Sequence, residues 1–217
     1  MGSEIPKQYL PLAGQTVIEH TLHKLAAVPG LSGIVVSLGH DDAWWAELDI
    51  DVGVPLRVVE GGRERVHSVF NAVDDIMPQL GDDDWLLVHD AARPCVHVED
   101  IVRLMETVAA HPCGGILAAP VRDTMKQAAA DGNIEATIDR STLWHALTPQ
   151  LFRADLLHQA LAAGLAHPEK ITDEASALEL LGYAPCLVAA PLDNLKITRP
   201  EDLPLAEFYL QRELADG

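Results

Sequence analysis

The chain has 217 residues, 48% of them hydrophobic, which suits one folded domain with a substantial core. Its 33 Asp and Glu residues outnumber 15 Lys and Arg residues, so the formal net charge is −18, which disfavours binding to nucleic acids or anionic membranes. The sequence has no apolar run near 18 residues and no cationic leader, and we expect no membrane span or signal peptide. Three widely spaced cysteines without a CxxC pair (Cys95, Cys113 and Cys186) indicate reduced thiols in a cytoplasmic protein.

The first half of the chain alternates between predicted helices and strands. Apolar residues at helical spacing predict a helix over residues 17–28, which Pro29-Gly30 ends. The elements that follow, in chain order, are a strand over 33–38, a short helix that opens at Asp41-Asp42, a strand over 56–59, a helix over 64–77 and a strand over 85–89.

The second half continues this alternation. We predict helices over 98–110, 154–165, 174–181 and 200–214, and strands over 115–121 and 186–190. Strands that alternate with helices are typical of a mostly parallel sheet with helices on both faces. The sequence therefore predicts an α/β fold, with a single domain over residues 1–217.

Residues 123–147 interrupt the alternation. Polar and apolar residues alternate around Thr124 and Lys126 and again from Ile134 to Ile138, on either side of the turn Asp131-Gly132-Asn133. This pattern predicts a two-stranded hairpin that leaves the sheet. Because a lone hairpin is marginally stable in water, we expect this β-arm to pack on a second subunit.

Conspicuous polar residues follow the predicted strands, where open parallel sheets bind their ligands. After the second strand, Gly61-Gly62 either lets the backbone approach a flat base or a phosphate, or forms a plain turn. After the third strand, Asp90 and Arg93 flank two alanines. Asp90 there could hold Mg²⁺ bridging phosphates, or could pair with Arg93 to fix the loop.

Three more cations have two readings each. Lys7 could meet a phosphate as a point charge or lie in solvent. Lys196, flanked by apolar residues beside Asp193-Asn194, is either a site lysine or a surface lysine. Arg140 in the predicted arm could reach a neighbouring site or form a surface pair with Asp139.

Taken together, these segments resemble the 2-C-methyl-D-erythritol 4-phosphate cytidylyltransferases of the non-mevalonate isoprenoid pathway. The matching runs cover nearly the whole chain in the family's order, which is far more specific than any single run. They are PKQYL (6–10), VIEHTL (17–22), GGRERVHSV (61–69), LVHDAARPC (87–95), GGILAAPVRDTMK (114–126), TIDRSTLWHALTPQLF (137–152), ITDEASALE (171–179) and DNLKITRPEDLPLAEFYL (193–210).

The resemblance implies a Rossmann-like nucleotidyltransferase fold and an activity. The phosphate of methylerythritol phosphate would attack the α-phosphorus of CTP in line and release pyrophosphate, without a covalent enzyme intermediate. Lys7 would be catalytic, stabilising charge on the transferring phosphate. CTP would be bound by Gly62, Arg63, Ser68, Asp90, Ala91 and Arg93, with Asp90 also holding Mg²⁺. Thr124, Arg140, Thr172 and Lys196 would position methylerythritol phosphate, with Arg140 reaching in from the other subunit's arm in a homodimer.

The resemblance departs at the start of the chain. Family members begin with a strand and a glycine-rich phosphate loop, roughly P-A-A-G-x-G-x-R-M, before PKQYL, whereas this chain opens with MGSEI. We therefore expect a strand to be missing from inside the sheet, with backbone groups of its neighbours left unpaired. We also expect weak CTP binding and little turnover by the chain as written, because the loop's N–H groups should cradle the triphosphate.

Two rival functions stay open. Another polyol phosphate, such as ribitol 5-phosphate, could be the acceptor, and residues 124–140 with Thr172 would then discriminate. Alternatively, the chain could be a non-catalytic nucleotide-binding or assembly protein. A dinucleotide-binding dehydrogenase is disfavoured, because no G-x-G-x-x-G follows a first strand.

Overall fold

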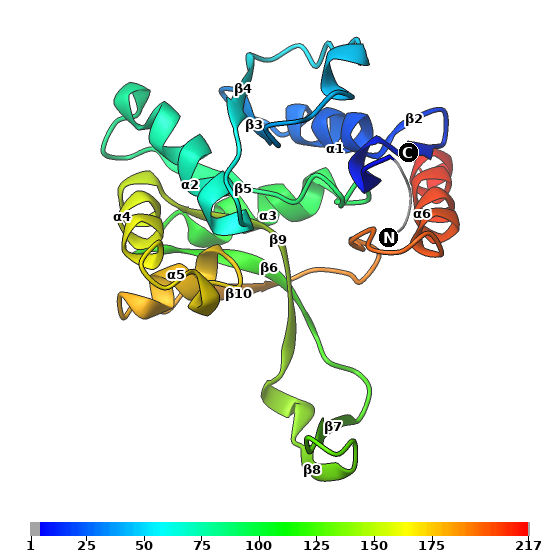
Figure 1. The fold of residues 1–217 in the computed structure, drawn as a ribbon, viewed down its shortest axis with the longest axis vertical. Coiled ribbons are helices and arrows are strands. Elements are labelled where there is room, and N and C mark those ends of the chain that lie inside the picture. Colours follow the sequence, from blue (N-terminus) through cyan, green and yellow to red (C-terminus); the bar gives the residue numbers. More distant parts are fainter. Residues whose placement is uncertain (1–4, 217) are drawn as a thin grey trace.

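A four-stranded mixed sheet in the order β10–β6–β9–β5 forms the centre of the molecule (Figure 1). The structure is a computed structural model and describes residues 5–216. In this sheet β10 pairs with β6 in parallel, and β9 runs antiparallel to both β6 and β5. A separate parallel pair joins β3 to β4. The strands are β3 (Ile34–Leu38), β4 (Leu56–Glu60), β5 (Trp85–Val88), β6 (Gly114–Pro120), β9 (Trp144–Arg153) and β10 (Cys186–Ala189).

Helices cover both faces of this sheet. Successive side chains of β6 point to opposite faces, and both sets of side chains pack against helices. Ile116 and Ala118 pack in one core cluster with α2 (Arg65–Ile76), α4 (Ala154–Gly164) and α5 (Glu174–Leu180). Leu117 and Ala119 pack in another cluster with α3 (Val98–Val108). The predicted two-faced α/β arrangement is therefore confirmed, and the sheet within it is mixed.

Helices α1 (Val17–Ala26) and α6 (Asp202–Asp216) lie on the side of the molecule away from α4 and α5 (Figure 1). The side chain of Val17 shares a buried cluster with Ala206 and Leu210 of α6. Thr16 caps α1 in a capping box with Glu19. The short elements are β1 (Pro11–Leu12), β2 (Gln15–Thr16) and the 3₁₀ turns η1 (Lys7–Tyr9), η2 (Trp45–Glu47), η3 (Met77–Gln79), η4 (Arg140–Thr142) and η5 (Pro168–Lys170).

The predicted hairpin is confirmed and projects from the body as an arm (Figure 1). Its strands β7 (Met125–Ala128) and β8 (Ile134–Ile138) pair antiparallel, and Gly132 adopts a φ of 84° in the turn. The side chain of Ile134 is 68% exposed there. Such an exposed apolar side chain on a projecting arm suits a contact with another molecule.

A cleft of about 1050 Å³ separates β3 from β5. Within residues 5–216, the β3–β4 pair is not hydrogen-bonded to the four-stranded sheet. Side chains of α1, α2, α3, β3 and β5 make most of the cleft apolar, but Lys7, Arg65, Asp90 and Lys196 line one end. The expected absence of an internal strand stays a prediction, and residues 1–4 lie outside the described residues.

Two elements differ from the sequence predictions. The short helix predicted to open at Asp41-Asp42 is only the 3₁₀ turn η2, and the Asp42 carboxylate accepts hydrogen bonds from the N–H groups of Trp44 and Trp45 at its start. The strand β9 was not predicted, because Pro149 within it argues against a central strand. No helix among residues 5–216 is long and apolar enough to span a membrane.

Candidate active site

Asp90 follows β5, and three cations surround its carboxylate: Arg93 from the same loop, and Arg65 and Lys196 from other segments. Oδ2 lies 3.0 Å from Nζ of Lys196 and 3.4 Å from Nε of Arg93, while Oδ1 lies 3.4 Å from Nε of Arg65. Burial alone would raise the pKa of Asp90, but the charges of Lys196, Arg65 and Arg93 outweigh it and lower the pKa to about 2. The carboxylate is therefore ionised throughout the physiological range.

Thr148 of β9 fixes the loop that carries Asp90. Its hydroxyl oxygen accepts the N–H of Asp90 at 3.1 Å and lies 2.9 Å from Nδ1 of His89. The other nitrogen of His89, Nε2, is 3.1 Å from the carbonyl of Arg93, which can only accept. His89 therefore carries its proton on Nε2, and Nδ1 accepts the hydroxyl proton of Thr148. Burial agrees with this neutral form, since it lowers the pKa of His89 to about 4.

A second set of bonds places Lys196. Arg93 donates from Nη1 to the carbonyl of Asn194 at 2.7 Å, and the buried side chain of Asn194 donates to the carbonyl of Thr148 at 2.8 Å. The N–H of Ile197 donates to the carbonyl of Ala92 at 2.8 Å. The loop after β10 is thus bonded to the loop after β5, which brings Lys196 against Asp90.

Lys7 reaches the same end of the cleft from η1. The neighbouring Tyr9 is buried, and its hydroxyl donates to Asp42 at 2.8 Å, which anchors this turn. Burial lowers the pKa of Lys7, and the charges of Lys196 and Arg93 lower it further against the opposing effect of Asp90. The protonated amine is therefore held where it is poorly solvated and gains from an anionic ligand.

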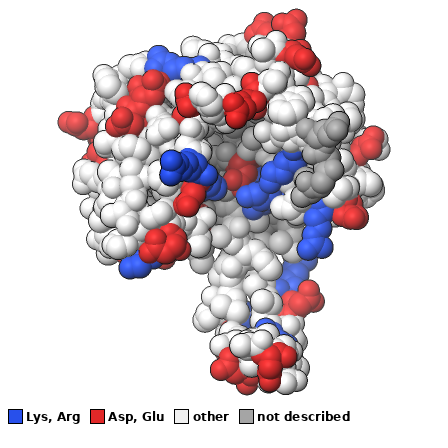
Figure 2. All heavy atoms as spheres, in the orientation of Figure 1, with Lys and Arg blue, Asp and Glu red and all other residues white. Residues whose placement is uncertain are grey.

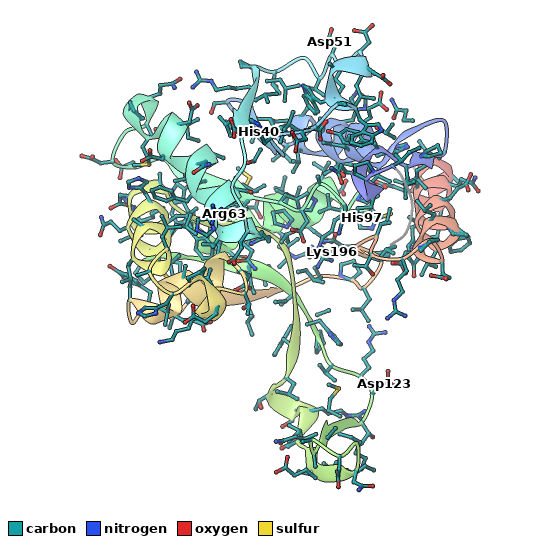
Figure 3. The ribbon with its side chains drawn as sticks, in the orientation of Figure 1. His40, Asp51, Arg63, His97, Asp123 and Lys196 are labelled. Carbon is teal, nitrogen blue, oxygen red and sulfur yellow. The ribbon has the colours of Figure 1, made fainter. Side chains whose placement is uncertain are left out.

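The Gly61-Gly62 segment forms a tight turn after β4. The Ser68 hydroxyl oxygen accepts the N–H of Gly62 at 3.0 Å. A Cβ at Gly62 would lie 2.2 Å from Cβ of His67, so this position requires glycine. Arg63 beside it is exposed and lies on the α2 side of the molecule, whereas Lys196 lies toward α6 (Figure 3). Figure 2 shows Lys and Arg side chains on both sides of a hollow in this face, with acidic atoms between them.

Arg65 and Glu174 were missed as site residues. Arg65 begins α2 and joins Asp90 to the buried Glu174 at the start of α5, with contacts of 2.5 and 2.9 Å to the two oxygens of Glu174. The sequence contained both residues within matching runs, but their pairing depends on a contact 109 residues apart in the chain.

The structure does not bring every predicted residue together. Lys7, Asp90, Arg93 and Lys196 form one cluster, with Ala91 beside it in the cleft lining. Three predicted acceptor-binding residues stand outside the cluster. Thr124 and Arg140 are exposed on the arm, where Arg140 donates to the carbonyl of Arg122, and Thr172 is exposed ahead of α5.

These residues can offer a metal ion only limited coordination. No group of three His, Cys, Asp or Glu residues suited to a metal occurs among residues 5–216. Mg²⁺ commonly uses only one or two carboxylates together with waters and substrate phosphates. Asp90 fits that mode, because it is an ionised carboxylate at the polar end of the cleft.

The fold has close counterparts among solved structures. A crystal structure of 4-diphosphocytidyl-2C-methyl-D-erythritol synthase matches with a TM-score of 0.84 and 41% identity, over 94% of this chain and 95% of that one. The Francisella tularensis 2-C-methyl-D-erythritol 4-phosphate cytidylyltransferase (IspD) matches with a TM-score of 0.84 and 36% identity, over 95% and 94%. With its cations gathered beyond the strand ends, this fold is that of a nucleotidyltransferase.

Sequence comparison narrows the class. The family profile of 2-C-methyl-D-erythritol 4-phosphate cytidylyltransferase matches residues 1–212. The Vibrio parahaemolyticus protein of that name is 52% identical over 98% of this chain and 91% of its own length, and the Escherichia coli O127:H6 protein is 49% identical over 99% and 89%. The chain belongs to the 2-C-methyl-D-erythritol 4-phosphate cytidylyltransferase family.

His89 predicts an acid sensitivity of the fold. Its folded pKa of about 4 lies below the ordinary value of 6.5, so between these values the unfolded chain binds a proton that the folded chain does not. Stability from this group should thus fall as pH drops from 6.5 to 4, by about 3 kcal/mol. Denaturant unfolding of the wild type and His89→Gln should show their free-energy difference shifting by this amount from pH 7 to pH 4. A difference independent of pH would contradict the neutral, buried histidine.

Proposed function

We propose that the cluster around Asp90 is where this chain carries out its family's reaction. The chain is a cytidylyltransferase that joins CTP to 2-C-methyl-D-erythritol 4-phosphate, forms 4-diphosphocytidyl-2-C-methyl-D-erythritol and releases pyrophosphate. The observation that carries the proposed site is the convergence of three cations on one partly buried carboxylate at a strand end. Such a group of fixed charges binds and orients phosphates even though the chain as a whole is strongly acidic.

Catalysis here consists of positioning and charge stabilisation. An oxygen of the acceptor phosphate attacks the α-phosphorus of CTP, the bond from that phosphorus to the bridging oxygen breaks, and pyrophosphate leaves with the electron pair. Lys7 stabilises the charge on the transferring phosphate, and Lys196 orients the acceptor phosphate. Because both amines lie at one end of the cleft, the two phosphates that they bind are brought together before the attack.

The nucleotide is held by three segments. The segment that carries Gly62, Arg63 and Ser68 binds the cytosine, and the hydrogen bond from the N–H of Gly62 to the Ser68 hydroxyl fixes its backbone. Ala91 and Arg93 lie by the ribose and the phosphates. Asp90 would hold Mg²⁺, which would neutralise charge on the triphosphate. The ionised state of Asp90 fits this role, because a carboxylate binds Mg²⁺ in its deprotonated form.

The acceptor needs residues that a single copy of the chain leaves apart. Thr124 and Arg140 lie on the arm, whereas Lys196 lies in the body, and Thr172 precedes α5. In a homodimer built through the arms, Arg140 of one subunit completes the site of the other. The exposed Ile134 on the arm supports this assembly.

The free thiols of Cys95, Cys113 and Cys186 support a cytoplasmic location.

A substrate comparison tests the activity. With CTP and Mg²⁺, pyrophosphate release with 2-C-methyl-D-erythritol 4-phosphate should exceed that with ribitol 5-phosphate by at least about 100-fold in kcat/KM, because a site that hydrogen-bonds one acceptor rejects another whose polar groups leave that site unpaired. A preference for ribitol 5-phosphate would contradict the assigned acceptor.

Subunit mixing tests the role of Arg140. Lys7→Ala and Arg140→Ala should each abolish most activity, since each removes one cation from every site. If Arg140 acts across the dimer, a mixture after subunit exchange contains heterodimers with one intact site, and roughly a quarter of the wild-type rate should return. Absence of recovery despite demonstrated exchange, or a monomer by sedimentation, would contradict the shared site.

A further inference from the structure

The buried carboxylate of Glu174 has no role in the reaction proposed above, although Arg65 links it to Asp90. Its side chain is 1% exposed, and both of its oxygens accept hydrogen bonds from the two terminal nitrogens of Arg65. The remaining nitrogen of Arg65, Nε, faces Asp90 at 3.4 Å. One guanidinium thus joins a buried carboxylate to the carboxylate at the centre of the site.

The position of Glu174 is itself rigidly determined. It begins α5 directly after Asp173, which caps that helix in a capping box with Ser176. The buried side chain of Gln150 in β9 donates to Asp173 at 2.8 Å and accepts the N–H of Ala175 at 2.9 Å. The start of α5 is therefore bonded to the central sheet on both sides of Glu174.

The guanidinium of Arg65 uses only part of its hydrogen-bonding capacity. Three bonds use three of the five N–H groups that a guanidinium carries, and the side chain lines the polar end of the cleft, where it is 37% exposed. Two N–H groups are therefore available to a phosphate oxygen. A flexible arginine beside Asp90 would instead be free to fold onto that carboxylate and neutralise it.

We propose that Glu174 is a positioning residue, which holds Arg65 in a fixed fork so that its free N–H groups face the phosphates of CTP while only its Nε contacts Asp90. This assignment rests on the proposed site. It also links the start of α5, where Thr172 lies, to the nucleotide end of the cleft.

The test compares two buried carboxylates that each pair with an arginine. Glu174→Gln should weaken CTP binding about tenfold, measured by titration calorimetry on the full chain. Asp100→Asn is the matched control, because Asp100 is 5% exposed and pairs with Arg103 at 2.5 Å on α3, against the opposite face of the sheet. It should change CTP binding less than twofold, although both variants should lose thermal stability. Equal weakening by both, or a Glu174→Gln affinity within twofold of wild type, would overturn the proposal.

A double variant checks that Glu174 acts through Arg65. Arg65→Gln alone leaves a buried unpaired carboxylate, which is strongly destabilising, so Arg65→Gln with Glu174→Gln is the form to measure. With the guanidinium absent, the double variant should bind CTP no more tightly than Glu174→Gln. Tighter binding would overturn the proposal. Product formation by the wild type is a separate readout, so CTP binding without product would count against the proposed function while leaving these comparisons decisive.

Discussion

The ion cluster around Asp90 is the interaction on which the site depends. A carboxylate largely enclosed by protein is costly to ionise, and Arg93 of the same loop together with Arg65 and Lys196 of two other segments compensates for that cost. The same contacts also stabilise the cations. Asp90 holds Lys196, Arg93 and Arg65 close together, where their like charges would otherwise repel one another. An anionic substrate entering this end of the cleft therefore meets cations that are already oriented.

The antiparallel strand β9 is the scaffold behind this cluster. Through Thr148 it bonds the loop of Asp90 and the loop of Lys196, and through Gln150 it bonds the start of α5. His89 completes the network only as a neutral ring, which explains why it can be buried beside a charged group. A single strand thus determines where three functional segments stand relative to one another.

The sequence predicted most of the fold because the chain is locally consistent. The helical periodicity of residues 17–28 correctly predicted α1, and the Asp-Gly-Asn turn correctly predicted the hairpin of the arm. The strand β9 escaped prediction, since Pro149 obscures its pattern. Its partners β5 and β6 lie far from it in the chain, and local propensity carries no information on such pairings.

The sequence likewise predicted only part of the candidate site. Lys7, Asp90, Arg93 and Lys196 were predictable from the resemblance, and the structure places them together. The pairing of Arg65 with Glu174 could not be predicted from the sequence. Until the burial of Glu174 is known, nothing distinguishes these two residues from exposed charged residues. Thr124 and Arg140 remain predictions of the dimer, since one copy of the chain holds them on the arm.

The most direct measurement is the rate of 4-diphosphocytidyl-2-C-methyl-D-erythritol formation by Asp90→Asn. Asparagine keeps the shape of the side chain and the backbone bond to Thr148 but removes the charge that organises the cations. The account predicts a fall in kcat/KM of at least about 100-fold in a folded protein, verified by circular dichroism. A rate within threefold of the wild type would contradict the central role of this carboxylate.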